Sequence, residues 1–254
     1  MLGRVFTRAS RLLADNVLFG FHPLAIPVQK AVQRLMRGPR EVTFRFKDGP
    51  GAGLRFSCLS SHKYFFLRED YERDLLEPIA RLIRPGSVAF DVGAHFGFWA
   101  LILSRLCGDA GKVFAFEPSP QNRARLQGNL AINSIENVEI VPFALSDTIG
   151  TGNMSDAGSM GSLSGDGIKI ETTTVDEFCR HHPKPDFMLI DVEGFATQVL
   201  RGAIDLYGQE FVPVICELHT DDEQAGFRRF MDGRAHQVRE LDKKNLLPNR
   251  TLAI

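Results

Sequence analysis

Two apolar runs of the sequence end in side chains that can move protons. The run Phe187–Ile190 is followed by Asp191 and Glu193 in the stretch DFMLIDVEG, and Glu217 and His219 come at the end of VICELH. Residues i and i+2 of an extended strand point to the same side, so each pair can face one site if its strand continues that far. Two neighbouring carboxylates raise the pKa of one of them, which suits acid–base chemistry near neutral pH. We predict that His219 is a general base and that Asp191 and Glu193 are catalytic groups that orient or bind the substrate.

The same side chains also allow two other interpretations. Asp191, Glu217 and His219 offer oxygen and nitrogen ligands that could hold Mg²⁺ or another divalent ion against a substrate hydroxyl. We rank this below general-base chemistry, so a metal ion is allowed but not expected. In a purely structural interpretation, the D-x-E-G turn caps the helix that follows it, and Glu217 pairs with an arginine.

A glycine-containing turn, FDVGAHFG, follows another apolar run. It places Asp91 at the end of a strand, and Gly93 and Gly97 lie where a backbone can approach a ligand before a helix begins. A dinucleotide site requires G-x-G-x-x-G, but His95 and Phe98 occupy the second and third glycine positions. S-adenosylmethionine (AdoMet) has no phosphate, and its amine suits the acidic Asp91. The turn therefore favours AdoMet over a dinucleotide.

A second acidic position supports an adenosine-containing ligand. Glu117 lies in FAFEPSP, one strand–helix unit after the glycine turn, where a carboxylate can accept both hydroxyls of a ribose. Ser119 and Pro120 behind it are typical of an N-cap and a first helical residue. Glu117 does not distinguish NAD from AdoMet.

From residue 87 onward, short apolar strands alternate with amphipathic helices. This pattern predicts an α/β domain over residues 87–254 with a parallel sheet covered on both faces. The last two runs, HQVREL and RTLAI, are too close together for a parallel crossover and should pair antiparallel. The expected strand–helix pairs are SVAFDVG with FGFWALILSRL, KVFAFEPS with PQNRARLQGNLAIN, DFMLIDVEG with ATQVLRGAIDLYG, and VPVICELH with DDEQAGFRRFMD, while VEIVPFALSD is a strand ending in a turn.

Residues 1–86 are expected to form an accessory segment. Residues 1–40 carry seven basic side chains against one acid, and the first dozen can make a basic amphipathic helix. This helix either docks on the main domain, which we favour, or contacts an anionic membrane surface. EVTFRF (41–46) and LRFSCL (54–59) predict a β-hairpin, and a helix from residue 71 leads to Pro85 and Gly86.

The Gly/Ser-rich stretch GTGNMSDAGSMGSLSGDG (150–167) has few large apolar side chains. It predicts a mobile loop at the carboxyl edge of the sheet, where ligands of open α/β folds bind. A substrate lid and a dispensable surface insertion are equally compatible with this composition.

Composition excludes several classes of partner. Thirty Lys and Arg against thirty-one Asp and Glu give a net charge of −1, so no nucleic-acid partner is expected. The four cysteines are scattered, which argues against a disulfide framework or a zinc site and favours a reducing, cytoplasmic location, with peripheral membrane contact through residues 1–40 left open. The apolar stretch at 17–28 is interrupted by prolines and is too short to span a bilayer. The sequence does not indicate an oligomeric state.

Taken together, these motifs resemble the FkbM-type AdoMet-dependent methyltransferases from about residue 68 to about residue 220. The resemblance rests on Tyr71-Glu72, DVGAHFGFWAL, FEPSP, FALSD and DFMLIDVEGFATQVLRGA, in the family's order. It implies a Rossmann-like class I methyltransferase fold, with a seven-stranded, mostly parallel sheet that ends in an antiparallel hairpin. It also implies methyl transfer to a hydroxyl of a sugar, a glycan or another natural-product acceptor.

The resemblance further implies which residues hold AdoMet. His95 stands where the family usually has asparagine, and Thr197 where it tends to have glutamate. These two departures support the rival hypothesis of a non-catalytic, membrane-associated scaffold that keeps the fold. The implied cofactor contacts are Asp91, Gly93, His95, Phe96 and Gly97 at the methionine end, Glu117 at the ribose, Ala144 and Leu145 at the adenine, and Asp147 at the adenine amino group or as a turn cap.

Overall fold

The protein is described here by a computed structural model covering residues 41–59, 73–154, 167–234, 238–241 and 250–253. The helix expected in residues 1–40 and the pair Tyr71-Glu72 lie outside these residues. The chain divides into two compact units, residues 1–42 with 59–66, and residues 43–58 with 67–254. No helix in the described part is long and apolar enough to cross a membrane. The larger unit carries the candidate site.

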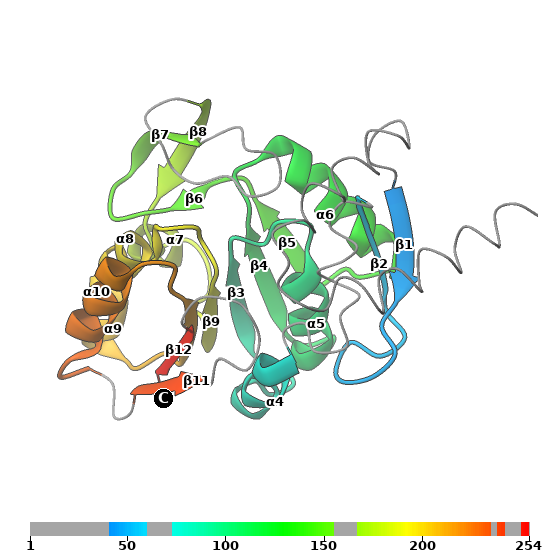
Figure 1. Cartoon of the computed structure of the whole chain (residues 1–254), viewed down its shortest axis with the longest axis horizontal. Coiled ribbons are helices and arrows are strands. Elements are labelled where there is room, and N and C mark those ends of the chain that lie inside the picture. Colours follow the sequence, from blue (N-terminus) through cyan, green and yellow to red (C-terminus); the bar gives the residue numbers. More distant parts are fainter. Residues whose placement is uncertain (1–40, 60–72, 155–166, 235–237, 242–249, 254) are drawn as a thin grey trace, which may run out of the picture. The chain divides into compact units, whose positions relative to one another are not determined.

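The larger unit is built around a sheet with the strand order β11-β12-β10-β9-β3-β4-β5 (Figure 1). Strands β10, β9, β3, β4 and β5 run parallel, while β12 pairs antiparallel with β10 and with β11. All four residues of β9 and of β10 are buried, as expected for central strands covered on both faces. The predicted α/β class with a parallel sheet is confirmed. The strands are β3 (Val88–Val92), β4 (Lys112–Phe116), β5 (Val138–Val141), β9 (Phe187–Ile190), β10 (Val214–Glu217), β11 (Val238–Leu241) and β12 (Arg250–Ala253).

Helices cover both faces of this sheet (Figure 1). On one face, aromatic side chains of the strands pack beneath the helix that carries Phe178, with its ring 4.9 Å from Phe116 and 5.1 Å from Phe114. The helices on this face are α7 (Val175–Cys179), α8 (Ala196–Arg201), α9 (Ile204–Gln209) and α10 (Asp221–Met231), those on the other face include α5 (Phe98–Cys107) and α6 (Pro120–Ile132), and α4 (Arg73–Leu82) precedes β3.

The helix boundaries agree with the sequence prediction in one case and differ in another. Ser119 caps α6 by accepting a hydrogen bond from the backbone N–H of Asn122, with Pro120 as the first helical residue, as predicted. The single helix expected over residues 196–208 is wrong, because the chain bends between α8 and α9. Gly202 lies there against the backbone of Ser146, where a Cβ atom would be 2.0 Å from the carbonyl oxygen.

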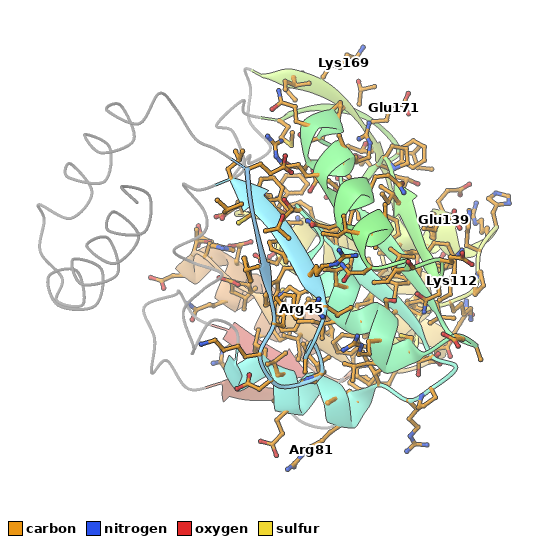
Figure 2. The ribbon with its side chains drawn as sticks, turned by 90° about the vertical axis from the view of Figure 1, so that its right-hand side faces the viewer. Arg45, Arg81, Lys112, Glu139, Lys169 and Glu171 are labelled. Carbon is orange, nitrogen blue, oxygen red and sulfur yellow. The ribbon has the colours of Figure 1, made fainter. Side chains whose placement is uncertain are left out.

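A second, small sheet replaces part of the predicted loop. Its order is β6 (Ala144–Leu145), β8 (Ile168–Thr173) and β7 (Gly150–Met154). Side chains alternate along β8, with Lys169 and Glu171 exposed and labelled in Figure 2. The prediction that residues 150–167 are one loop is therefore wrong for residues 150–154, and residues 155–166 lie outside the described part. The stretch VEIVPFALSD, which was predicted to be one strand that ends in a turn, contributes to two sheets. Strand β5 ends at Val141 in the large sheet, and β6 pairs with β8 in the small one.

The predicted hairpin is present, and its aromatic side chains pack against α5 of the larger unit. Strands β1 (Glu41–Arg45) and β2 (Arg55–Leu59) form a two-stranded sheet. The rings of Phe46 and Phe56 lie 5.3 and 6.0 Å from the ring of Phe98, the first residue of α5.

Figure 2 shows the face of the larger unit on which Lys112 of β4 and Glu139 of β5 lie. These two side chains form an ion pair at 3.0 Å.

One asparagine of α6 connects the hairpin to the glycine turn. The side-chain oxygen of Asn129 accepts a hydrogen bond from the backbone N–H of Ser57 at 2.7 Å. Its amide nitrogen donates to the carbonyls of Ser57 at 2.9 Å and of Phe96 at 2.8 Å. Asn129 is fully buried, so these bonds replace water completely.

Candidate active site

The glycine turn between β3 and α5 lies directly against the end of β9. Gly93 has φ +90°, a left-handed conformation that favours glycine. A Cβ atom at this position would be 2.1 Å from the carbonyl oxygen of Asp191. The backbone N–H groups of Gly93 and Ala94 both donate to the carbonyl of Phe116 at 3.0 Å. The turn is thereby held between the ends of β4 and β9.

The backbone conformation at position 95 of the turn explains why a polar side chain is found there. His95 has φ 51°, a conformation in which His, Asn and Asp are the commonest residues other than glycine. Its ring stacks on that of Phe96 at 3.8 Å between ring centroids, and Phe96 is buried. Histidine therefore meets the same backbone requirement as the asparagine of the resembling family. Gly97 closes the turn with φ +88° before α5 begins.

Asp91, the acid at the end of β3, is buried with 2% of its surface exposed. Its pKa is raised to about 8, first by burial and then by the negative charges of Asp191 and Glu117. The oxygen Oδ2 has no hydrogen-bond partner among the described residues. A buried, unsatisfied carboxylate oxygen is expensive, and an ammonium group would satisfy it.

Glu117 holds the glycine turn from the tip of β4. Its Oε2 accepts a hydrogen bond from the backbone N–H of His95 at 2.8 Å, and its Oε1 accepts bonds from Ser119 N at 2.8 Å and from Asn122 Nδ2 at 3.3 Å. Burial raises the pKa of Glu117, while these hydrogen bonds lower it. A carboxylate oxygen can accept two hydrogen bonds, so Oε2 keeps one lone pair for a hydroxyl group.

The segment predicted to flank adenine leaves the sheet beside Glu117, whose backbone N–H donates to the carbonyl of Val141 at 3.0 Å. Ala144 is half-buried and Leu145 is buried in β6. Asp147 is exposed, and its carboxylate accepts a hydrogen bond from the Ser146 hydroxyl at 3.2 Å. The contact of Asp147 with adenine stays a prediction.

The acids at the ends of β9 and β10 meet around one imidazole. His219 Nε2 lies 3.4 Å from Glu193 Oε2, 3.6 Å from Glu217 Oε1 and 4.0 Å from Asp191 Oδ1. The prediction placed each pair of side chains on one continuous strand. In the structure β9 ends at Ile190 and β10 at Glu217, so strand geometry aligns neither Asp191 with Glu193 nor Glu217 with His219. Instead, the turns after the two strands bring the side chains together.

The predicted metal-ligand set is also assembled. One ligand atom each of Asp191, Glu217 and His219 lies within 4.8 Å of the others. Carboxylate oxygens and an imidazole nitrogen in this arrangement can coordinate a divalent ion. The geometry is compatible with a metal-assisted reaction as well as with general-base catalysis.

One buried acid that the sequence prediction missed lies behind this cluster. Glu223 of α10 accepts hydrogen bonds from the backbone N–H of Ala196 at 3.0 Å and of His219 at 2.8 Å. Its own N–H donates to the hydroxyl of Thr220, the N-cap of α10. The sequence pattern Thr-x-x-Glu indicates that Glu223 lies in the first turn of a helix, but it does not indicate which neighbouring backbone groups the carboxylate binds.

Thr197 faces α10 rather than the acid cluster. A Cβ atom built on Gly226 would lie 2.5 Å from Thr197 Oγ1 and 2.8 Å from its methyl carbon, so the two helices approach closely here. Thr197 Oγ1 has no hydrogen-bond partner among the residues that the structure describes. The small side chain at position 197 therefore has a packing reason.

Comparison with known proteins identifies the family of this chain. A family model described as the methyltransferase FkbM domain matches residues 91–244, more than half of the chain. The hexuronic acid methyltransferase AglP of Haloferax volcanii is 29% identical over 186 residues, which cover 67% of this chain and 72% of that protein. The crystal structure of methyltransferase FkbM from Methylobacillus flagellatus KT matches with a TM-score of 0.53 at 13% identity, over 76% of this chain and 52% of that chain.

The structural match shows that the two proteins share a fold, and this chain spans about half the length of the Methylobacillus protein. The family match covers the glycine turn, Glu117 and both acid-bearing turns. The resemblance inferred from the sequence is therefore confirmed. The chain belongs to the FkbM methyltransferase domain family.

Proposed function

We propose that this protein is an AdoMet-dependent O-methyltransferase that acts on a hydroxyl of a sugar, a glycan or a related small molecule. The observation that carries the proposal is the cluster of three carboxylates around His219 Nε2, next to the turn formed by Gly93. AglP is named for its action on a hexuronic acid, which supports a sugar acceptor.

The described residues fit AdoMet. The unsatisfied Oδ2 of Asp91 suits the amine of the methionine portion, and Glu117 Oε2 can accept a hydrogen bond from a ribose hydroxyl. Gly93, His95, Phe96 and Gly97 would surround the methionine portion, and Ala144, Leu145 and Asp147 would lie at the adenine. AdoMet supplies an electrophilic methyl group for transfer to an oxygen.

The chain's own residues would prepare the acceptor hydroxyl. His219 Nε2 accepts the hydroxyl proton, and the carboxylates of Glu193, Glu217 and Asp191 surround the positive charge that the ring then carries. The deprotonated oxygen would then take the methyl group as the bond between the methyl carbon and the sulfonium sulfur breaks, with S-adenosylhomocysteine as the leaving group. Asp191 and Glu193, which are partly exposed, can also accept hydrogen bonds from neighbouring hydroxyls of a sugar and hold it in line.

A metal-assisted version is the second candidate, because Asp191, Glu217 and His219 form a compatible ligand set. In that version the three residues would hold a divalent ion, which would lower the pKa of a bound hydroxyl. We favour the general base because the three carboxylates at 3.4 to 4.0 Å from Nε2 would stabilise the imidazolium that forms when the ring takes the proton of the acceptor.

The non-catalytic alternative loses its two arguments. His95 meets a backbone requirement that asparagine also meets, and Thr197 fills a close helix contact. Neither departure from the family pattern removes a group from the cluster around His219. Membrane contact through residues 1–40 stays a prediction, because these residues lie outside the described part.

Radiolabelled AdoMet tests the proposal directly. The protein is incubated with hexuronic acids, neutral hexoses and glycans, and label in the acceptor is measured with and without EDTA. We expect methylation of a hydroxylated acceptor that survives EDTA; activity that disappears and returns with Mg²⁺ would favour the metal version. Calorimetry that detects binding of NAD but of neither AdoMet nor S-adenosylhomocysteine would falsify the proposal.

A further inference from the structure

A single buried carboxylate joins the two turns of the candidate site. Glu223 has 4% of its surface exposed, and its two oxygens bind different parts of the chain. Oε1 accepts the N–H of Ala196, three residues after Glu193, and Oε2 accepts the N–H of His219 itself. Glu223 therefore bridges the turn after β9 and the turn after β10.

Both hydrogen bonds of Glu223 have a carboxylate oxygen as the acceptor. A hydrogen bond from a backbone N–H to an ionised carboxylate is shorter and about twice as strong as one between neutral groups. Glu223 also lies in the first turn of α10, where a negative charge is favourable, and Thr220 caps its N–H at 3.1 Å. The carboxylate is thus fixed on its own helix and can hold both neighbouring backbones in place.

From this arrangement we infer that Glu223 is a positioning residue, which sets the separation of Glu193 and His219 and thereby the rate of the proposed methyl transfer. The inference rests on the proposed function. Glu193 and His219 lie 3.4 Å apart but belong to different strand–helix connections, and the Glu223 carboxylate is bonded to both connections. A displacement of about 1 Å at a reacting group can lower a rate about a hundredfold.

The chain contains a matched control for this role. Thr174 and Glu177 begin α7 with the same Thr-x-x-Glu pattern, and Thr174 accepts the N–H of Glu177 at 3.0 Å. The Glu177 carboxylate, however, pairs with Arg180 and His181 of its own segment. Loss of the Glu177 carboxylate therefore removes an acid from the same helix position without touching the candidate site.

The experiment compares Glu223→Gln, Glu223→Ala and Glu177→Gln in the full-length chain. A glutamine offers one oxygen and one N–H₂ group, so Glu223→Gln can keep only one of the two bonds. We measure kcat, the AdoMet dissociation constant by calorimetry, and the exchange rates of the Ala196 and His219 amide hydrogens by NMR. The conservative variant also covers the case in which Glu223→Ala does not fold.

We expect kcat to fall about tenfold in Glu223→Gln and about a hundredfold in Glu223→Ala. AdoMet affinity should stay within twofold, at least one of the two amides should exchange at least tenfold faster in Glu223→Gln, and Glu177→Gln should match the wild type. The inference is overturned if Glu223→Gln leaves kcat or both exchange rates unchanged, or if Glu177→Gln lowers kcat equally. A wild-type protein that transfers no methyl group would defeat the proposed function and with it the effect of Glu223 on the rate, while amide exchange would still show whether the bridge exists.

Discussion

Gly93 lies directly against the carbonyl oxygen of Asp191, at a distance that leaves no room for a Cβ atom. The N–H of Asp191 donates to the carbonyl of Val92 at 2.9 Å, so the glycine turn and the acid-bearing turn are joined on both sides of this contact. Asp191 also contributes to the raised pKa of Asp91. The glycine turn and the turn that carries Asp191 are therefore directly connected.

Substitution of Gly93 should affect both stability and cofactor binding. Gly93→Ala combines a left-handed backbone with a clash against Asp191, which together should lower the free energy of unfolding by about 4 kcal/mol. We also expect AdoMet affinity to fall at least tenfold. Gly86→Ala is the control, because Gly86 has φ +93° but open space around it, so only the backbone term of about 1–2 kcal/mol applies. Equal losses for the two variants in urea denaturation would contradict the role of the contact.

The raised pKa of Asp91 predicts how stability depends on pH. Burial, then Asp191 and Glu117, move this pKa from 3.8 to about 8 in the folded protein. The folded state therefore holds the proton more tightly than the unfolded state, so the stabilisation is complete below pH 3.8 and is lost as the pH rises toward 8. Relative to Asp91→Asn, wild-type stability should fall by up to about 1.4 kcal/mol per pH unit between pH 5 and pH 7.

Urea denaturation of both proteins at several pH values measures this difference. Asp91→Asn keeps the shape of the side chain but cannot titrate, so groups that do not interact with Asp91 contribute equally to the two curves. Parallel curves for the two proteins across this range would show that Asp91 ionises normally in the folded state.

His219 should be needed for turnover but not for cofactor binding. General-base catalysis contributes about 10² to 10⁴ to a rate, so we expect His219→Gln to lower kcat by a factor in this range. Asp191→Asn should lower kcat as well, and AdoMet affinity should stay within a few-fold in both variants. His182→Gln is the control, since that ring stacks on Phe178 of α7. Wild-type turnover of His219→Gln would exclude it as the base.

Much of this site could be predicted because the signals are local. The apolar run before Asp191 predicts a buried strand, and acids directly behind it must emerge at the sheet edge. The glycine turn and Glu117 could be predicted for the same reason, because each follows an apolar run that forms a buried strand. The strand β7 was missed because GTGNM has low intrinsic preference for a strand, and its pairing depends on the alternating residues of β8.

Glu223 shows why the remaining contacts could not be predicted. The patterns around Glu177 and Glu223 are the same in sequence, yet only the Glu223 carboxylate reaches a neighbouring turn. That difference arises from the approach of α8 to α10, which no local pattern specifies. The contact of Gly93 with Asp191 is of the same kind, because it joins residues about a hundred positions apart.

Restoring the family residue at position 197 should weaken the protein. Thr197→Glu places a larger, charged side chain against Gly226, and overpacking of this kind lowers stability by about 1–3 kcal/mol. We expect no gain in kcat. Gln198→Glu adds the same charge at the next position of α8, where a change within about 0.5 kcal/mol is expected. A thermal unfolding midpoint of Thr197→Glu equal to that of Gln198→Glu would argue against the packing role.

The hydrogen bonds of Asn129 have a practical consequence for the boundaries of an expression fragment. The family match begins at residue 91, but the amide of Asn129 is satisfied partly by Ser57, and Phe98 is covered by Phe46 and Phe56. A fragment that starts at residue 87 would leave a buried amide short of partners and an aromatic surface open to water. Recombinant production of the α/β domain should therefore include the chain from residue 41, where β1 begins.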